Sequence, residues 1–350
     1  LHIDGQAVAL TNGNSLTTTA NSFDVNVSVA AGTATVTLSK AAGYTIGDAQ
    51  TLVDGLAYAN SSDDPLGASR TVTLTAIQDN GGTANGGVDL TALSIGSTVT
   101  LTAVNDGPSL TATADDPTFT EGGAAGGLFS SSSIGLVEAA DSVDTITLTV
   151  AGLQNGSDEL LHIDGQAVAL TNGNSLTTTA NSFDVNVSVA AGTATVTLSK
   201  AAGYSTGDAQ TLVDGLAFAN SSDDPLGASR TVTLTAIQDN GGTANGGVDL
   251  TALSIGSTVT LTAVNDGPSL TATADDPTFT EGGAAAGMFS STSIGLVEAA
   301  DSVDTITLTV AGLQNGSDEL LHIDGEAVAL TNGNGLTTTA NSFDVNVSVA

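Results

Sequence analysis

Apolar residues alternate with Thr, Ser or Asn in several short stretches, a pattern typical of half-buried β-strands. In DTITLTV (144–150), the alternation places Ile146, Leu148 and Val150 on one face. The same pattern predicts strands in FDVNVSV (23–29), TATVTLS (33–39), RTVTLTAI (70–77) and STVTLTAV (97–104). The Thr-rich outer faces suit strands because β-branched side chains pack well on a pleated surface. The intervening AAGT (30–33) predicts a hairpin.

One stretch, GDAQTLVDGLAYAN (47–60), has helical spacing, and Asp48 is a candidate N-cap. Its apolar residues at this spacing are Leu52, Val53, Leu56 and Ala57. We expect a short helical crossover there. The many short strands with Gly, Asn and Asp turns predict an all-β fold, a β-sandwich of the cadherin-like or Ig-like type. A solenoid is the alternative because the inner faces are small, but the chain lacks a short internal period of about 20 residues.

The chain repeats itself with a period of 160 residues. Residues 1–106 match 161–266 at all but three positions, and 321–350 repeat 1–30 with two changes. Such near-identity indicates recent duplication within an array. The period far exceeds that of a solenoid repeat, so we expect an extended string of domains.

The motif AVNDGP marks the boundaries, because Pro and Gly end a strand. It divides the chain into 1–106, the C-terminal part of a unit; 107–266, a complete unit; and 267–350, the N-terminal part of a unit. Two interpretations follow: a window from a longer array, or a subunit whose ends complement those of other copies. The thirty-residue overlap favours the array, because a self-complementing subunit does not need it.

The chain carries 37 acidic and four basic side chains, a formal net charge of −33. That balance excludes nucleic acid as a partner, because phosphate binding requires clustered Lys and Arg. The sequence contains no run of roughly 18 apolar residues, so we do not expect this segment to insert into a membrane. The absence of Cys excludes disulfides and thiol chemistry. Hydrophobic residues make up 40 % of the chain, which argues against disorder.

The acidic residues lie mostly in predicted turns, where calcium is a plausible partner because it binds six to eight hard oxygen ligands. A unit with 17 acidic and two basic side chains carries −15, so bound calcium would reduce repulsion between neighbours. The principal candidate cluster combines the linker residues Asn105 and Asp106 with Glu121, Asp141 and Asp144, which lie near the ends of predicted strands. The full candidate set of ligands is Asp79, Asp89, Asn105, Asp106, Glu121, Asp141, Asp144, Asp239, Asp249, Asn265, Asp266, Glu281, Asp301 and Asp304. The alternative role for each is an ordinary turn former or solvated surface group.

The ordered motifs FTEGG, LVDGLAYANSSDDP, RTVTLTAIQDNGG and VTLTAVNDGP resemble the cadherin-like repeats of giant bacterial extracellular adhesins, which often carry RTX-type calcium-binding tails. The resemblance covers the whole chain, although the 160-residue unit is longer than the family's usual repeat. It implies calcium-rigidified extender domains with a role in attachment or a biofilm matrix. Where the motifs match those of the family, the resemblance implies calcium-binding loop positions at Asp79, Asn105, Asp106, Glu121, Asp141 and Asp144.

Catalytic chemistry has little support. His2, His162 and His322 are one repeat position, and a lone His in a strand is usually a packing residue. No Gly-x-Ser-x-Gly elbow or phosphate-binding glycine motif occurs. Lys40 and Lys200 follow a predicted strand and are candidates for an isopeptide crosslink, although an exposed strand-end Lys is the simpler interpretation.

We therefore expect a non-enzymatic, extracellular repeat segment of a cell-surface adhesin or secreted matrix fibre, acting as a calcium-stiffened spacer. Its expected partners are neighbouring repeats. The first alternative is a self-assembling filament subunit joined head to tail by strand complementation, whose partners would be identical chains. The second alternative is a carbohydrate- or ice-binding module, because Thr-rich strands such as TVTLT present ordered hydroxyl groups.

Overall fold

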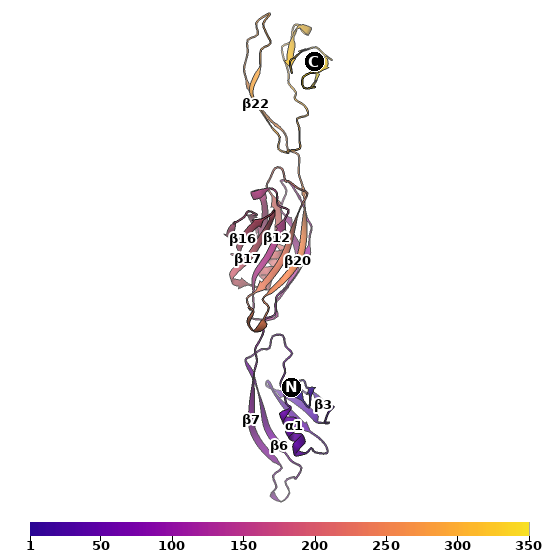
Figure 1. The fold of residues 1–350 in the computed structure, drawn as a ribbon, viewed down its shortest axis with the longest axis vertical. Helices are drawn as coiled ribbons and strands as arrows, with labels where there is room; N and C mark the ends of the chain where they lie inside the picture. The colour runs from indigo at the N-terminus through magenta and orange to yellow at the C-terminus, as the bar shows by residue number, and fades with distance from the viewer. Residues whose placement is uncertain (350) are drawn as a thin grey trace.

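The structure is a computed structural model that describes residues 1–349. The protein is mostly β-strand, as the sequence pattern predicts, with two α-helices among the described residues. Figure 1 shows the chain drawn out along one axis, with residues 107–266 between the two terminal parts. We call residues 1–106, 107–266 and 267–350 the N-terminal, central and C-terminal segments.

The central segment contains a seven-stranded sheet and a four-stranded sheet. The larger sheet has the order β15 (Ser175–Thr177), β16 (Asp184–Ala190), β17 (Thr193–Tyr204), β12 (Val143–Ala151), β19 (Ser229–Asp239), β20 (Leu250–Thr262) and β9 (Thr118–Thr120). The smaller sheet has the order β10 (Gly126–Gly127), β18 (Ala217–Asn220), β13 (Glu159–Ile163) and β14 (Gln166–Ala169). A separate pair joins β8 (Ser109–Ala114) to β11 (Phe129–Gly135).

Strand β12 lies in the middle of the larger sheet, antiparallel to both β17 and β19. Its alternating residues Ile146, Leu148 and Val150 are completely buried, as the sequence pattern predicts. They share one hydrophobic core with Leu161 and Phe218 of the smaller sheet. This core also includes apolar residues of the helix α2, so both sheets and the helix contribute to it.

The predicted helix is present in both copies, as α1 (Ile46–Asp54) and α2 (Thr206–Asp214). Its predicted N-cap is wrong. Thr45 caps α1 and accepts a hydrogen bond from the Asp48 backbone, while the Asp48 carboxylate bonds back to the Thr45 N–H in a capping box. The predicted apolar face of the helix is also too long. Gly55 ends α1, so Leu56 and Ala57 lie outside the helix. In the central copy, Ala209, Leu212 and Val213 form the buried face.

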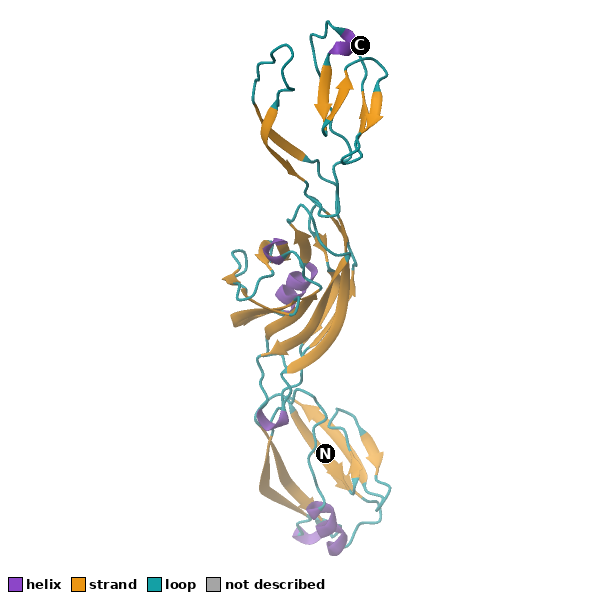
Figure 2. Cartoon of the chain, turned by 45° about the horizontal axis from the view of Figure 1, so that its top comes forward, coloured by secondary structure: helices purple, strands orange, loops and turns teal. Residues whose placement is uncertain are grey.

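The N-terminal segment contains three small sheets. They are formed by β1 (His2–Ile3) with β2 (Gln6–Ala7); β3 (Ser15–Thr17), β4 (Asp24–Ala30) and β5 (Thr33–Ser39); and β6 (Ser69–Gln78) with β7 (Leu90–Thr100). Figure 2 shows β6 and β7 as a group of strands separate from β3–β5. The hairpin predicted at 30–33 is confirmed: Ala31 and Gly32 have positive φ angles of 50° and 76°, as a tight two-residue turn requires.

The C-terminal segment contains three strand pairs. These are β21 (Ser269–Ala274) with β22 (Phe289–Gly295), β23 (Leu320–Ile323) with β24 (Glu326–Ala329), and β25 (Gly335–Thr337) with β26 (Asp344–Asn346). The described residues also form short 3₁₀ turns: η1 (Ala84–Gly86), η2 (Gly156–Asp158), η3 (Ala244–Gly246) and η4 (Gly316–Asp318). Residues 303–311 have the same sequence as β12 but form no strand.

Candidate cation site at the junction of the first two segments

The linker that follows β7 is attached to the central segment through Asn105. The Asn105 carbonyl accepts a 2.9 Å hydrogen bond from the Val248 N–H. The side-chain Nδ2 donates to Val248 O at 2.6 Å and to Asp239 Oδ1 at 3.0 Å. Three hydrogen bonds therefore join this linker residue to the end of β19 and to the loop between β19 and β20.

A second loop, preceding β12, approaches the same place. Ser142 and Asn240 exchange two hydrogen bonds, from the Ser142 N–H to Asn240 Oδ1 at 2.8 Å and from the Asn240 N–H to Ser142 O at 3.1 Å. This pairing brings Asp141 beside the β19–β20 loop. Glu138, in the same loop as Asp141, accepts from the Asp106 N–H at 3.3 Å. Linker, β12 loop and β19–β20 loop thus converge at the junction.

Three side-chain oxygens of this cluster are buried without a hydrogen-bond partner: Asn105 Oδ1, Asp141 Oδ2 and Asp239 Oδ2. Asp239 itself is only 2 % exposed. Each unpaired buried polar group costs about 1–3 kcal/mol, so three together are unusual in a folded protein. Three unpaired oxygens in one place form the kind of surface that a cation satisfies.

Gly241 leaves the space into which these oxygens point. A Cβ atom on Gly241 would lie 1.9 Å from Asn105 Oδ1 and 2.6 Å from Asp141 Oδ2, so any other residue would collide with both. The Gly241 N–H also donates to Asp239 Oδ1 at 3.0 Å. Asn105 Oδ1 and Asp141 Oδ2 therefore face the same small space beside the backbone of Gly241.

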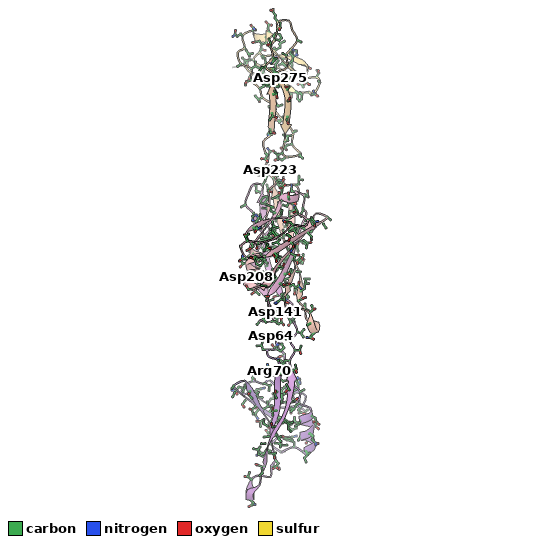
Figure 3. All side chains as sticks on the ribbon, turned by 90° about the vertical axis from the view of Figure 1, so that its left-hand side faces the viewer. Asp64, Arg70, Asp141, Asp208, Asp223 and Asp275 are labelled. Atoms are coloured by element: carbon green, nitrogen blue, oxygen red, sulfur yellow. The ribbon has the colours of Figure 1, made fainter. Side chains whose placement is uncertain are left out.

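The cluster is strongly negative. The pKa of Asp141 is raised by burial of its carboxyl group, and further by the negative charges of Asp239, Glu138 and Asp64. Asp64 belongs to the N-terminal segment, and Figure 3 shows it beside Asp141 at the junction. Like charges held close together without a counter-ion destabilise one another, and a divalent cation would remove that repulsion.

The donor set suits a hard cation, since all its atoms are carboxylate or amide oxygens. Among residues 1–349, no three His, Cys, Asp or Glu side chains converge closely enough to hold a metal by themselves. The junction cluster brings two such carboxylates, from Asp141 and Asp239, together with the amide oxygen of Asn105. A bound Ca²⁺ would need further oxygens, which backbone carbonyls and water commonly supply.

The structure separates several of the predicted ligands from this cluster. Glu121 lies at the opposite end of the central segment, where its Oε2 accepts from the Val264 N–H at 2.8 Å. Asp144 lies on β12 and accepts from its neighbour Thr145. The Asp249 carboxylate accepts from Gln238, and Asp106 contributes only its backbone N–H, to Glu138.

No described linker residue is hydrogen-bonded to the N-terminal copy of the loop. Asp79 is exposed and Asp89 is half-buried; Asp79 accepts from the Gly81 N–H and Asp89 from Gln78. In the central segment, Asp239 is buried, in contrast to Asp79, whereas Asp249 is half-buried like Asp89. The same sequence therefore forms the cluster only where a linker and a β12 loop both reach it.

The second junction contains part of the same arrangement. Asp266 donates its N–H to Glu298 Oε1 at 2.9 Å, as Asp106 does to Glu138, and Glu298 Oε2 is buried without a partner. Asn265 and Asp301 are exposed, and Asp304 accepts from Thr305. Glu281, the repeat of Glu121, is also exposed. No described residue occupies the place that Asp239 has at the first junction.

Sequence reasoning missed Glu138, Asp64 and Gly241. Glu138 and Asp64 occur in acidic turns, LVEAADS and SSDDP, and thus carried the same signal as the selected acids.

The three histidines lie in β1, β13 and β23, as the pattern predicts. Lys40 and Lys200 place their ammonium groups over Phe23 and Phe183, at 5.5 and 5.4 Å from the ring centres.

Comparison of the chain with models of protein families, with curated proteins and with solved structures finds no significant match. None of the described helices is long and apolar enough to cross a membrane.

Proposed function

We propose that this chain is an extracellular structural repeat segment of a long surface adhesin or matrix fibre, in which calcium stiffens the junctions between repeats. The observation that carries the proposal is the group of three buried, unpaired oxygens at the first junction, on Asn105, Asp141 and Asp239. A cation bound there would connect the linker to two loops of the next repeat.

The architecture is consistent with a spacer. In the central segment, two sheets contribute to one core, which supports a cadherin-like or Ig-like β-sandwich as the repeating domain. The segments follow one another along the long axis of the molecule (Figure 1). Near-identical repeats suit a spacer, because the length of such an array matters more than the local chemistry of any one repeat.

Charge gives calcium a physical role. The central segment carries −15, so adjoining repeats repel one another. Asp64 and Asp141 come from different segments and lie together at the junction, where the pKa of Asp141 is raised by burial and by like charges. Calcium would offset this repulsion where the hinge is, and thereby limit bending between repeats.

The test is thermal unfolding of the 350-residue chain with calcium and with chelator, in the wild type, Asp141→Asn and Asp301→Asn. Both variants replace the same repeat position, but only Asp141 faces a partner like Asp239. Calcium should raise the melting temperature of the wild type and of Asp301→Asn, because binding to the native state alone stabilises it. The rise should be much smaller in Asp141→Asn.

In chelator the expected order reverses, because Asp141→Asn removes a destabilising charge and should melt at the same temperature as the wild type or higher. A calcium response that is equal in all three proteins would contradict the proposed site. No response in any of them would remove calcium from the function.

A further inference from the structure

The central segment contains three Asn-x-Ser triplets, which begin at Asn155, Asn186 and Asn220. In a secreted protein, such a triplet is an acceptor for N-linked glycosylation when its middle residue is not Pro. None of the three middle residues is Pro, so all three sequences qualify. The structure separates them, because a bulky carbohydrate chain needs an acceptor amide that is unengaged and faces the surface.

The amides of Asn155 and Asn220 are engaged by the fold. Asn155 Nδ2 donates to Ser222 Oγ at 3.2 Å and to the Asp224 carbonyl at 2.9 Å. Asn220 is 4 % exposed, and its Nδ2 donates to Asn155 Oδ1 at 3.1 Å. A sugar on either nitrogen would break these hydrogen bonds and leave polar groups without partners inside the protein. The fold therefore excludes both residues as acceptors.

Asn186 lies in different surroundings. It is exposed on the outer face of β16, and among the described residues its Nδ2 donates no hydrogen bond. Its Oδ1 accepts from Ser175 Oγ at 2.8 Å, which orients the planar amide while the nitrogen stays free. Ser188, the hydroxyl residue of the triplet, is exposed on the same face, because residues two apart in a strand point the same way. The acceptor nitrogen and the serine are therefore accessible together.

The first copy of this repeat position has the same geometry. Asn26, in β4, is exposed, and its Oδ1 accepts from Ser15 Oγ at 2.9 Å. Strands β3–β5 pair in the same register as β15–β17, so the arrangement belongs to the repeat itself. Both copies also have an acid two residues before the acceptor, Asp24 and Asp184, which a transferase can bind through a basic group. Neither of the engaged triplets has an acid at that position.

The surface around Asn186 suits a carbohydrate. Its cross-strand neighbour on β17 is Thr197, which pairs in turn with Thr147 of β12. In the next row of the same face, Ser188 pairs with Thr195. These side chains are small and uncharged, and their hydroxyl groups both donate and accept hydrogen bonds. They leave room for a sugar on the acceptor nitrogen and offer partners for its hydroxyl groups.

We propose that Asn186 is an N-glycosylation site and that its repeat copy Asn26 is a second one. The co-substrate is an oligosaccharide carried on a polyprenyl pyrophosphate. A bond forms between the amide Nδ2 and the anomeric carbon of the first sugar, and the bond from that carbon to the pyrophosphate oxygen breaks. The polyprenyl pyrophosphate leaves with the electron pair, and the amide proton passes to a base of the transferase. The inference goes beyond the spacer function: it requires export of the chain but not calcium.

The test is mass spectrometry of tryptic peptides from the 350-residue chain, expressed and exported in its native host. Because the chain has only four basic side chains, trypsin releases residues 1–40, 71–200 and 201–230 as separate peptides. Peptide 1–40 contains the triplet of Asn26, peptide 71–200 those of Asn155 and Asn186, and peptide 201–230 that of Asn220. The mass of an oligosaccharide should appear on the first two peptides and not on the third.

Three variants locate the sugar within peptide 71–200. Ser188→Ala removes the hydroxyl group of the Asn186 triplet and should abolish the added mass, whereas Ser188→Thr keeps the triplet and should retain it. Ser157→Ala is the matched control, because it removes the exposed serine of the Asn155 triplet and should leave the added mass unchanged. An exported wild type without sugar on this peptide would overturn the proposal, as would sugar that survives Ser188→Ala. The calcium response of the melting temperature tests the spacer function separately.

Discussion

Residues 1–106 and 161–266 differ at three positions, yet they form different structures. In the second copy, α2 buries Ala209, Leu212 and Val213, whereas Val53 in the first copy is 43 % exposed. Arg230 is buried in an ion pair, while Arg70 is exposed. The difference arises because residues 107–160 supply β12 and the start of β13, including Glu159, to the second copy only. Local sequence favours the strands and turns, but the completed sheet determines burial and, as residues 303–311 show, whether a strand forms at all.

The largest expected difference concerns the buried ion pair. Glu159→Gln would leave Arg230 charged and buried without its partner, which should lower the free energy of unfolding by about 3–5 kcal/mol. Glu319→Gln, at the same repeat position, faces no arginine in the monomer and should cost about 1 kcal/mol or less. Urea unfolding of both variants at a concentration where the chain is monomeric measures the difference. Equal losses would contradict the comparison.

The strand β12 provides the next test. Leu148→Ala removes a fully buried side chain from the middle of the larger sheet and should cost about 2–5 kcal/mol. Leu308→Ala changes the identical position where the side chain is 51 % exposed, and should change the monomer by about 0.5 kcal/mol or less. The same unfolding measurement applies. If Leu308→Ala destabilised the monomer as much as Leu148→Ala, residues 303–311 would have to be packed.

Glycines at the candidate site give a smaller effect. A Cβ at Gly241 would collide with Asn105 Oδ1 and Asp141 Oδ2, whereas at Gly81 the nearest atom is Asp79 Oδ1 at 3.1 Å. Gly241→Ala should therefore cost about 1–3 kcal/mol and abolish stabilisation by calcium. Gly81→Ala should change stability by about 0.5 kcal/mol or less and leave the calcium response intact. Thermal unfolding with and without calcium distinguishes them, and equal calcium responses would rule out the cluster as the site.

The smallest expected effect is on acid stability. Burial acts to raise the pKa of Asp164, but hydrogen bonds from Thr178 and Asn181 outweigh it, so the pKa lies below the ordinary value of 3.8. A lowered folded-state pKa contributes stability above the unfolded-state pKa, and this contribution is lost as the pH falls through the folded-state value. Asp164→Asn should therefore flatten the loss of stability below pH 3.8. An unchanged acid profile would contradict this assignment.

Much of the fold could be predicted from the sequence, because alternation and turn chemistry act locally. Phe23, Val25 and Val27 are buried on one face as predicted, and the turn at 30–33 follows from its Ala-Gly pair. The cap of α1 was misassigned because Thr45 and Asp48 bond reciprocally, so the pattern alone did not show which residue precedes the helix.

The candidate site was less predictable, because its residues come from three places along the chain. Asn105 and Asp141 were named on local grounds, but spacing did not show that Asp239, more than 130 residues from Asn105, would meet the linker. Glu121 occurs in a similar acidic turn and lies at the other end of the segment. Strand order within the sheet, which the sequence pattern does not specify, decides which acidic turns share an end.

In the proposed function, calcium fixes the linker to the repeat that follows it. The chain has no Cys, so spin labels can be placed cleanly at Ser188→Cys in the central segment and Thr35→Cys in the N-terminal segment, both exposed positions. Pulsed electron paramagnetic resonance then gives the distribution of distances across the junction. If calcium holds the junction, the distribution of distances should be narrow with calcium and broad with chelator. In Asp141→Asn it should be broad under both conditions. A distribution of the same width with and without calcium would contradict this role of calcium.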